Sequence, residues 1–206
     1  MEHIASYKLS LSPESTSIPT PNYSRRADLQ EPNTPALSSF QLASVLSKRI
    51  EQIDQYYRKE WSKRANQGPL KMAARSVQSN EELFCFPDPE QPSSDPRFFI
   101  QLLVEGGQFT PETLLVGYIL LERFLELSGI RRPLDFCDLY AVAVLVANKY
   151  LQETERWALE EYALLSEMPK ENIATLEQKF LSTIDYRVLV CPKQYSAYLK
   201  VLRKEL

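Results

Sequence analysis

The chain has 206 residues, of which 44% are apolar and 25% charged, as in globular proteins that bury a core. Its net charge of −3 argues against a protein built mainly to bind nucleic acid. The three cysteines lie far apart, which fits neither a disulfide framework nor a CxxC metal site, and the first residues carry no secretion or myristoylation signal. We therefore expect one domain with extensions, located in the cytoplasm or the nucleus.

Residues 1–37 are expected to form a disordered arm. They contain five prolines among many Ser, Thr and Asn residues, and too few apolar side chains to offset the entropy of ordering. Three residues that precede a proline are candidate sites of proline-directed phosphorylation: Ser12, Thr20 and Thr34. A phosphate would act there as a charge switch, although such dipeptides also arise by chance in any tail of this composition.

Residues 38–64 are predicted to form an amphipathic helix. Its apolar stripe consists of Leu42, Leu46, Ile50, Ile53, Tyr57 and Trp61. The opposite face is basic: eight basic and three acidic residues lie between Ser38 and Arg75, so this segment carries +5 and the remainder −8. Three interpretations stay open: a helix docked on the main domain, a helix that binds a partner, and a contact to a membrane surface or to nucleic acid.

A linker at residues 65–94, rich in Pro, Gly and Ser, is predicted to precede a helical domain at residues 95–206. Asp95-Pro96 has the pattern of a first helix start, and Gly106-Gly107 ends that helix. The second helix starts at Thr110-Pro111 and stops at Gly129.

The segment Leu139–Lys149 is the most apolar part of the chain. Its first nine residues are all apolar, too few for a bilayer, which needs about 20. Its alternating valines would also suit a strand, and periodicity alone cannot decide for so short a run. Asp135 and Asp138 before the run, with Lys149 at its end, favour a helix. A helix that is apolar all round must be enclosed by other helices.

Three further elements follow this buried helix. A short helix is predicted from Trp157 to Leu165, and a longer one from near Pro169, with an apolar stripe at helical spacing. An extended connector at residues 188–190 then leads to a short helix that begins at Pro192. Because no strand-rich region remains, the predicted fold class is all-α.

This helical unit resembles the cyclin box. The resemblance is carried by ETLLVGYILLERFL, AVLVANKY and LEQKFLSTIDYRVLV, and it covers more than half of the chain, from about Asp95 to Leu206. It is closest to single-box cyclins of the cyclin Y and PHO (phosphate-pathway) type. The positions at family-like spacing are Tyr118–Phe124, Ala147-x-Lys149, Trp157, Leu176-Glu177 with Phe180-Leu181, and Pro192-x-x-Tyr195. The resemblance implies a five-helix box around a buried central helix, flanked by the N-terminal amphipathic helix and a short C-terminal helix.

In that family, the lysine after the buried helix and the glutamate of the fifth helix hydrogen-bond the backbone of a kinase beside its regulatory helix. By resemblance these roles fall on Lys149 and Glu177. Apolar contacts to the kinase are expected from Tyr150, Phe180, Phe98 and Phe99, although most aromatic side chains pack in cores. The alternative is that Lys149 only complements a helix dipole and Glu177 is a solvated charge.

The sequence also departs from the family pattern. The arginine-tryptophan signature with which cell-cycle cyclins form a substrate-docking patch is missing from Arg97–Glu105. PHO-type members usually have an asparagine and a glycine pair in the fourth-helix region, where this chain has Leu159 and Ser166-Glu167. Cyclin Y is lipid-anchored, and nothing in this sequence supports such an anchor.

The function implied is that of a regulatory subunit, which binds and activates a cyclin-dependent protein kinase of the PCTAIRE/PHO-pathway type as a heterodimer. We do not expect an enzyme, because the single histidine, His3, lies in the arm and no phosphate-binding motif is present. No cofactor, metal, nucleic-acid partner or transmembrane segment is expected. One alternative is a non-activating cyclin-fold scaffold that uses the basic helix. Another, a transcription-initiation factor, would need a basic face that the −8 remainder does not offer.

Overall fold

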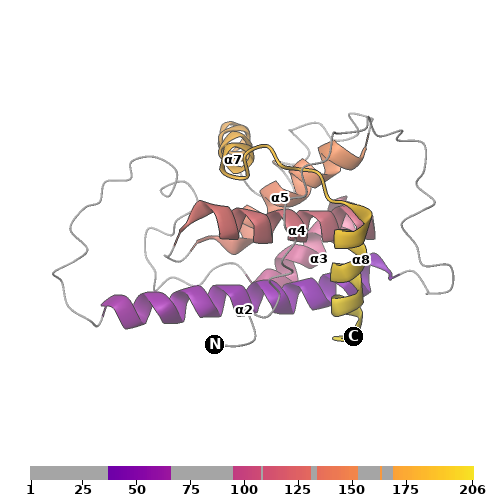
Figure 1. The fold of residues 1–206 in the computed structure, drawn as a ribbon, viewed down its shortest axis with the longest axis horizontal. Coiled ribbons are helices and arrows are strands. Elements are labelled where there is room, and N and C mark those ends of the chain that lie inside the picture. The colour runs from indigo at the N-terminus through magenta and orange to yellow at the C-terminus, as the bar shows by residue number, and fades with distance from the viewer. Residues whose placement is uncertain (1–36, 66–94, 108, 131–133, 153–162, 164–168) are drawn as a thin grey trace.

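The computed structural model describes residues 37–65, 95–107, 109–130, 134–152, 163 and 169–206. These ranges contain six helices, shown in Figure 1: α2 Ser39–Ala65, α3 Pro96–Gly107, α4 Pro111–Ser128, α5 Phe136–Leu151, α7 Lys170–Thr183 and α8 Pro192–Arg203. The described part has no β strand, which confirms the all-α fold class. Within it, no helix is both long and apolar enough to span a membrane. The three phosphorylation candidates, residues 66–94 of the predicted linker and nearly all of the predicted fourth helix lie outside the described residues.

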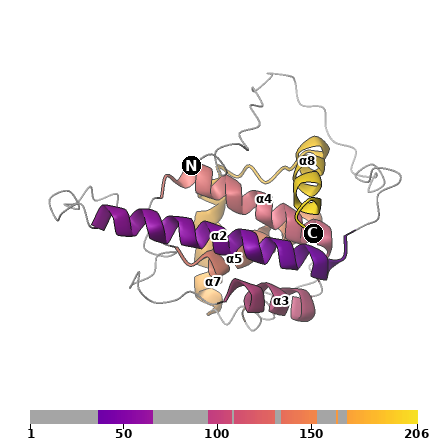
Figure 2. The same cartoon turned by 90° about the horizontal axis from the view of Figure 1, so that it is seen from below.

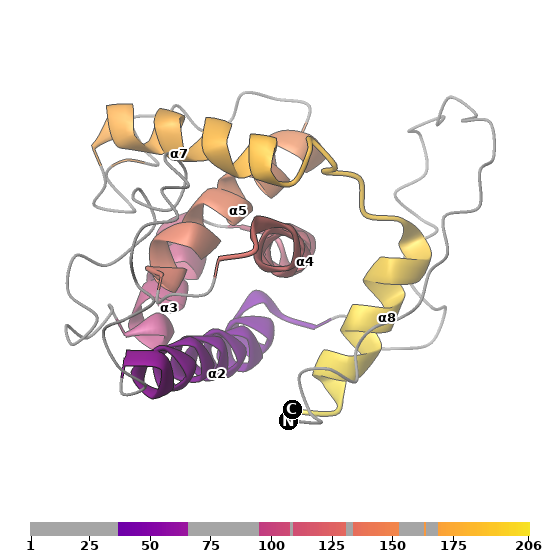
Figure 3. The same cartoon turned by 60° about the vertical axis from the view of Figure 1, so that its left-hand side comes forward.

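Helices α4 and α5 form the centre of the molecule. In Figure 3, α4 is seen end-on, with α2, α5, α7 and α8 around it. Every residue of α5 from Phe136 to Asn148 is buried except Asp138, so the prediction of an enclosed helix at Leu139–Lys149 is confirmed. The two helices approach closely at Gly117, where a Cβ atom would lie only 2.8 Å from Cγ2 of Val144 and 3.0 Å from its Cα.

The ends of α4 and α5 lie where their capping residues predict. The Thr110 hydroxyl accepts a hydrogen bond from the Thr113 amide at 3.2 Å, and Gly129 closes α4 in the left-handed conformation with φ of 64°. The carboxylate of Asp135 accepts from the amides of Cys137 and Asp138, both at 3.1 Å. These caps satisfy amides and carbonyls that have no partner within a helix, and so they fix where the two central helices begin and end.

The Asp138 carboxyl makes stability depend on pH. Burial, together with the neighbouring Asp135, raises the pKa of Asp138 from its ordinary value of 3.8 to about 7. Because the folded chain keeps a proton that the unfolded chain loses near pH 4, the free energy of unfolding falls as pH rises from about 4 to about 7.

We predict that Asp138→Asn raises the free energy of unfolding by about 1–2 kcal/mol at pH 8 and changes it little at pH 4.5, because asparagine resembles the protonated acid. Urea unfolding of both proteins at the two pH values measures this difference. An equal difference at pH 4.5 and pH 8 would contradict the assignment of the proton to Asp138.

The first half of α2 packs into the core. Its buried residues are Leu42, Ala43, Val45, Leu46 and Ile50. They face α3 and α4, beside which α2 runs in Figure 2. The Tyr57 ring continues the contact, with its centroid 5.3 Å from that of Phe136. Of the three interpretations of this helix, the structure therefore shows the docked one for its first half, while the charged face remains exposed to solvent.

Polar contacts hold helix α8 at its middle and just beyond its C-terminal end. The Tyr198 hydroxyl donates to Oε2 of Glu122 on α4 at 2.5 Å. The Arg49 guanidinium on α2 donates through Nε to Oε2 of Glu205 at 2.9 Å. The C-terminal segment is thus tied to both α4 and α2.

Candidate functional site

Lys149 and Glu177, 28 residues apart in the sequence, form an ion pair on the surface. The Lys149 ammonium lies 2.7 Å from both carboxylate oxygens of Glu177. Lys149 comes from the last turn of α5, and Glu177 from the middle of α7. The two helices are in contact, and the buried residues of α7 are Ile173, Leu176 and Phe180.

The pair retains hydrogen-bonding capacity for a partner. An ammonium has three donors, of which the two carboxylate oxygens take two, and a carboxylate has about four acceptor positions. The Lys149 side chain is 51% exposed and that of Glu177 17%. Exposed pairs stabilise a fold by only about 0–1 kcal/mol, so this pair can rearrange at little cost when a binding partner arrives. The arrangement therefore offers a donor and several acceptors side by side on rigid helices.

A strained turn follows α7 and displays two apolar side chains. Asp185 and Tyr186 both have φ of 54°, a left-handed conformation that costs non-glycine residues about 1–2 kcal/mol each. The Tyr186 amide donates to the Leu181 carbonyl at 2.8 Å, which closes the turn. Tyr186 is 64% exposed and Leu189, in the connector beyond, 62%. Such strain persists only where the surrounding structure enforces it. The fold therefore holds the turn in the conformation that leaves these side chains exposed.

Arg123 of α4 holds this connector in place. Its guanidinium donates to the carbonyls of Arg187 and Leu189, the latter at 3.2 Å, and to Oε1 of Gln194 on α8, also at 3.2 Å. Burial lowers the pKa of Arg123 from its ordinary value, but a guanidinium in a protein keeps its charge. One charged group therefore satisfies backbone carbonyls of the connector and links α4 to α8.

The aromatic residues predicted to contact a kinase divide into two groups. Phe180 is fully buried and stacks on Phe124, with ring centroids 5.1 Å apart. Phe99 is also buried, so both rings pack in the core, and their contact with a partner stays a prediction. Phe98 is 69% exposed on α3, and Tyr150 is half-buried next to Lys149. Partner contacts for these two and for the ion pair remain predictions.

Sequence reasoning missed three residues of this surface: Arg123, Tyr186 and Leu189. Glycine is the usual sequence signal for a left-handed backbone conformation, and the turn contains no glycine. The only available signal was Asp185, because aspartate tolerates the left-handed region better than most residues. For Arg123, the local sequence contains no signal that marks a contact with a distant segment.

Residues 96–189 match the protein-family model described as "Cyclin, N-terminal domain". Over these residues the chain is similar to that family. The matched segment includes Lys149, Glu177 and the turn at Tyr186, whereas α2 precedes it. Cyclin domains are regulatory and not catalytic, which fits the expectation of a regulatory protein. The match does not distinguish subtypes of cyclin, so assignment to the cyclin Y and PHO type stays a prediction.

Proposed function

We propose that this chain is the regulatory subunit of a cyclin-dependent protein kinase, which it binds through its cyclin domain and activates. The observation that carries the proposal is the Lys149–Glu177 pair, which two packed helices of a cyclin domain hold on an exposed face. From the resemblance to PHO-type and Y-type cyclins, we infer that the kinase is of the PCTAIRE/PHO-pathway type.

The geometry supports recognition of a backbone segment. The free donor of Lys149 can bind a carbonyl of the kinase, and the unused acceptor positions of Glu177 can bind an amide. Tyr186 and Leu189 supply exposed apolar surface beyond the end of α7, of the kind that interfaces bury at their centre. A kinase regulatory helix held against this face would stay in its active position and complete the lysine–glutamate ion pair inside the kinase.

To test this proposal, the chain is recovered from its native cells through a mild affinity tag. The amount of bound kinase and the kinase activity are then measured. Lys149→Glu is expected to lower kinase affinity at least tenfold, with a matching loss of activity, because it removes the donor and places like charges together. Glu177→Lys should have the same effect.

Lys63→Glu is the matched control, because Lys63 is similarly exposed at 55% and likewise ion-paired, to Glu60 at 2.6 Å, but lies on α2. It should leave kinase binding unchanged. A bound kinase that is indifferent to both Lys149→Glu and Glu177→Lys would contradict the proposal.

The second candidate is a cyclin-fold scaffold that does not activate a kinase and binds its partner through α2. The exposed charged residues in the second half of α2 favour it. The same variants separate the two functions: for the scaffold, Lys63→Glu weakens partner binding, whereas Lys149→Glu and Glu177→Lys leave it intact.

A further inference from the structure

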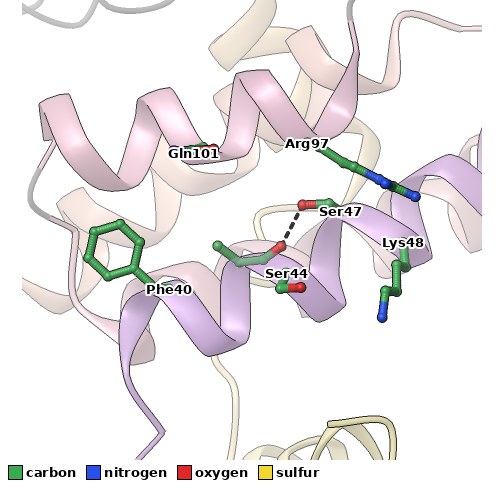
Figure 4. Close-up of a pocket in the computed structure, with 7 residues that line it drawn as sticks. Phe40, Ser44, Ser47, Lys48, Arg97 and Gln101 are labelled. Carbon is green, nitrogen blue, oxygen red and sulfur yellow. Dashed lines mark hydrogen bonds between the residues drawn. The ribbon is translucent and has the colours of Figure 1, made fainter.

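A groove between α2 and α3 has an apolar end and a basic end. Its volume is about 340 Å³, and it is lined by Phe40, Ala43, Ser44, Ser47, Lys48, Arg97 and Gln101. Figure 4 shows Phe40 at one end and Lys48 with Arg97 at the other. Phe40 is 60% exposed, which leaves its ring open to a ligand. The groove lies outside the Lys149–Glu177 site, and nothing in the proposed function uses it.

Hydrogen bonds hold the α2 side of the groove. The Ser47 hydroxyl donates to the Ala43 carbonyl at 2.5 Å within α2. At the start of that helix, the Ser38 amide donates to Oε1 of Gln41 at 3.1 Å, and the Ser39 hydroxyl donates to the Phe109 carbonyl at 3.1 Å. The α2 side of the groove is therefore ordered without a ligand, which lowers the entropy cost of binding.

Negative charge at the basic end compensates the two cations only in part. Lys48 is exposed and makes no ion pair among the residues that the structure describes. Arg97 is met by the Glu51 carboxylate at 3.4 Å, a long contact between side chains that are 66% and 41% exposed. Two cations at one end of the groove, with one carboxylate in a long contact, favour an acidic ligand.

We propose that the groove binds residues 28–35 of the chain's own N-terminal arm. The arm joins α2 at Leu37, beside Phe40 and therefore at the apolar end of the groove. Residues 27–36 include Asp28 and Glu31 and no basic residue, so their charge is complementary to that of Lys48 and Arg97. Pro32 and Pro35 lie between these acids and the start of the helix.

The lengths of the two segments agree with this placement. Lys48 lies ten positions after Ser38, about 15 Å along the axis of α2. The six residue-to-residue steps from Glu31 to Leu37 span up to about 20 Å when extended. The arm can thus turn back, place its prolines on the Phe40 ring and bring Glu31 and Asp28 to the two cations. A short tether also gives the arm an effective concentration of about millimolar, so weak contacts suffice.

The test measures binding of a fluorescent peptide that copies residues 27–37 to the full-length protein by anisotropy. In the wild type, the arm competes with the peptide for the groove. The variant Asp28→Asn, Glu31→Gln weakens the arm's own contacts and should bind the peptide about tenfold more tightly than the wild type. Adding Lys48→Glu to that variant should lower the affinity about tenfold, whereas adding Lys63→Glu on the same helix should not change it.

Equal peptide binding by the wild type and the neutralised variant would overturn the proposal, as would equal binding of a scrambled peptide. A second measurement is zero-length carbodiimide crosslinking of the wild-type chain, read by peptide mass spectrometry. A crosslink from Lys48 to Glu31 or Asp28 within a monomer supports the proposal. Crosslinks that occur only between two copies would instead assign the groove to a second chain and overturn it.

Discussion

Phe180→Ala is expected to lower the free energy of unfolding by about 3–5 kcal/mol, the usual cost of removing a fully buried aromatic ring from a core. The ring has no exposed surface and stacks on Phe124 at an interplanar angle of 8°. Its loss leaves a cavity between α4 and α7 that neighbouring helices cannot fill without moving. Because α7 carries Glu177, the change also loosens one side of the ion pair.

Urea unfolding of the full-length protein measures this effect, and Phe98→Ala is its control. The control deletes the same atoms from a side chain that is 69% exposed, so it should change stability by no more than about 0.5 kcal/mol. If the two variants were destabilised equally, the assignment of Phe180 to the core would be wrong.

Gly117→Val is expected to lower the free energy of unfolding by about 3 kcal/mol or more, at the upper end of the cost of overpacking a core. Even a single Cβ atom at this position would lie 3.0 Å from the Cα and 3.2 Å from the backbone nitrogen of Val144. Backbone atoms cannot move aside as a side chain can, so α4 and α5 would have to separate along their whole contact. Gly117→Ala should show the same effect at smaller size.

The control for Gly117 is Glu126→Val, which places the same β-branched residue at an exposed position of the same helix. It tests helix propensity without the close approach, and should cost about 0.5 kcal/mol or less. Thermal or urea unfolding of the three proteins measures the difference. Loss of stability in Glu126→Val as large as in Gly117→Val would show that propensity, and not the contact with Val144, accounts for the effect.

The sequence predicted the helices well because their boundaries depend on local chemistry. Thr110, Gly129 and Asp135 each act on amides or carbonyls within a few residues, so their effect can be read without knowing the fold. The same holds for the enclosed helix α5, since a run of apolar residues with polar ends has few other stable placements.

The candidate site was harder to predict because it depends on contacts between distant residues. Helical spacing placed Phe180 on an apolar stripe, but such a stripe looks the same whether it faces a core or a partner. Lys149 and Glu177 come from different helices, and Arg123 binds carbonyls of a connector far from it in the sequence. No local sequence pattern predicts either contact. The docking of α2 stayed open for the same reason.

The core includes residues of α2, which lies outside the segment that matches the family model. The matched segment begins at residue 96, yet Leu42, Leu46 and Ile50 fill the space between α3 and α4. A fragment cut at the edge of the match would expose the apolar faces that α2 covers, and a large exposed apolar patch favours aggregation. We therefore expect that the smallest fragment that folds on its own includes α2, because the core needs the apolar residues of that helix.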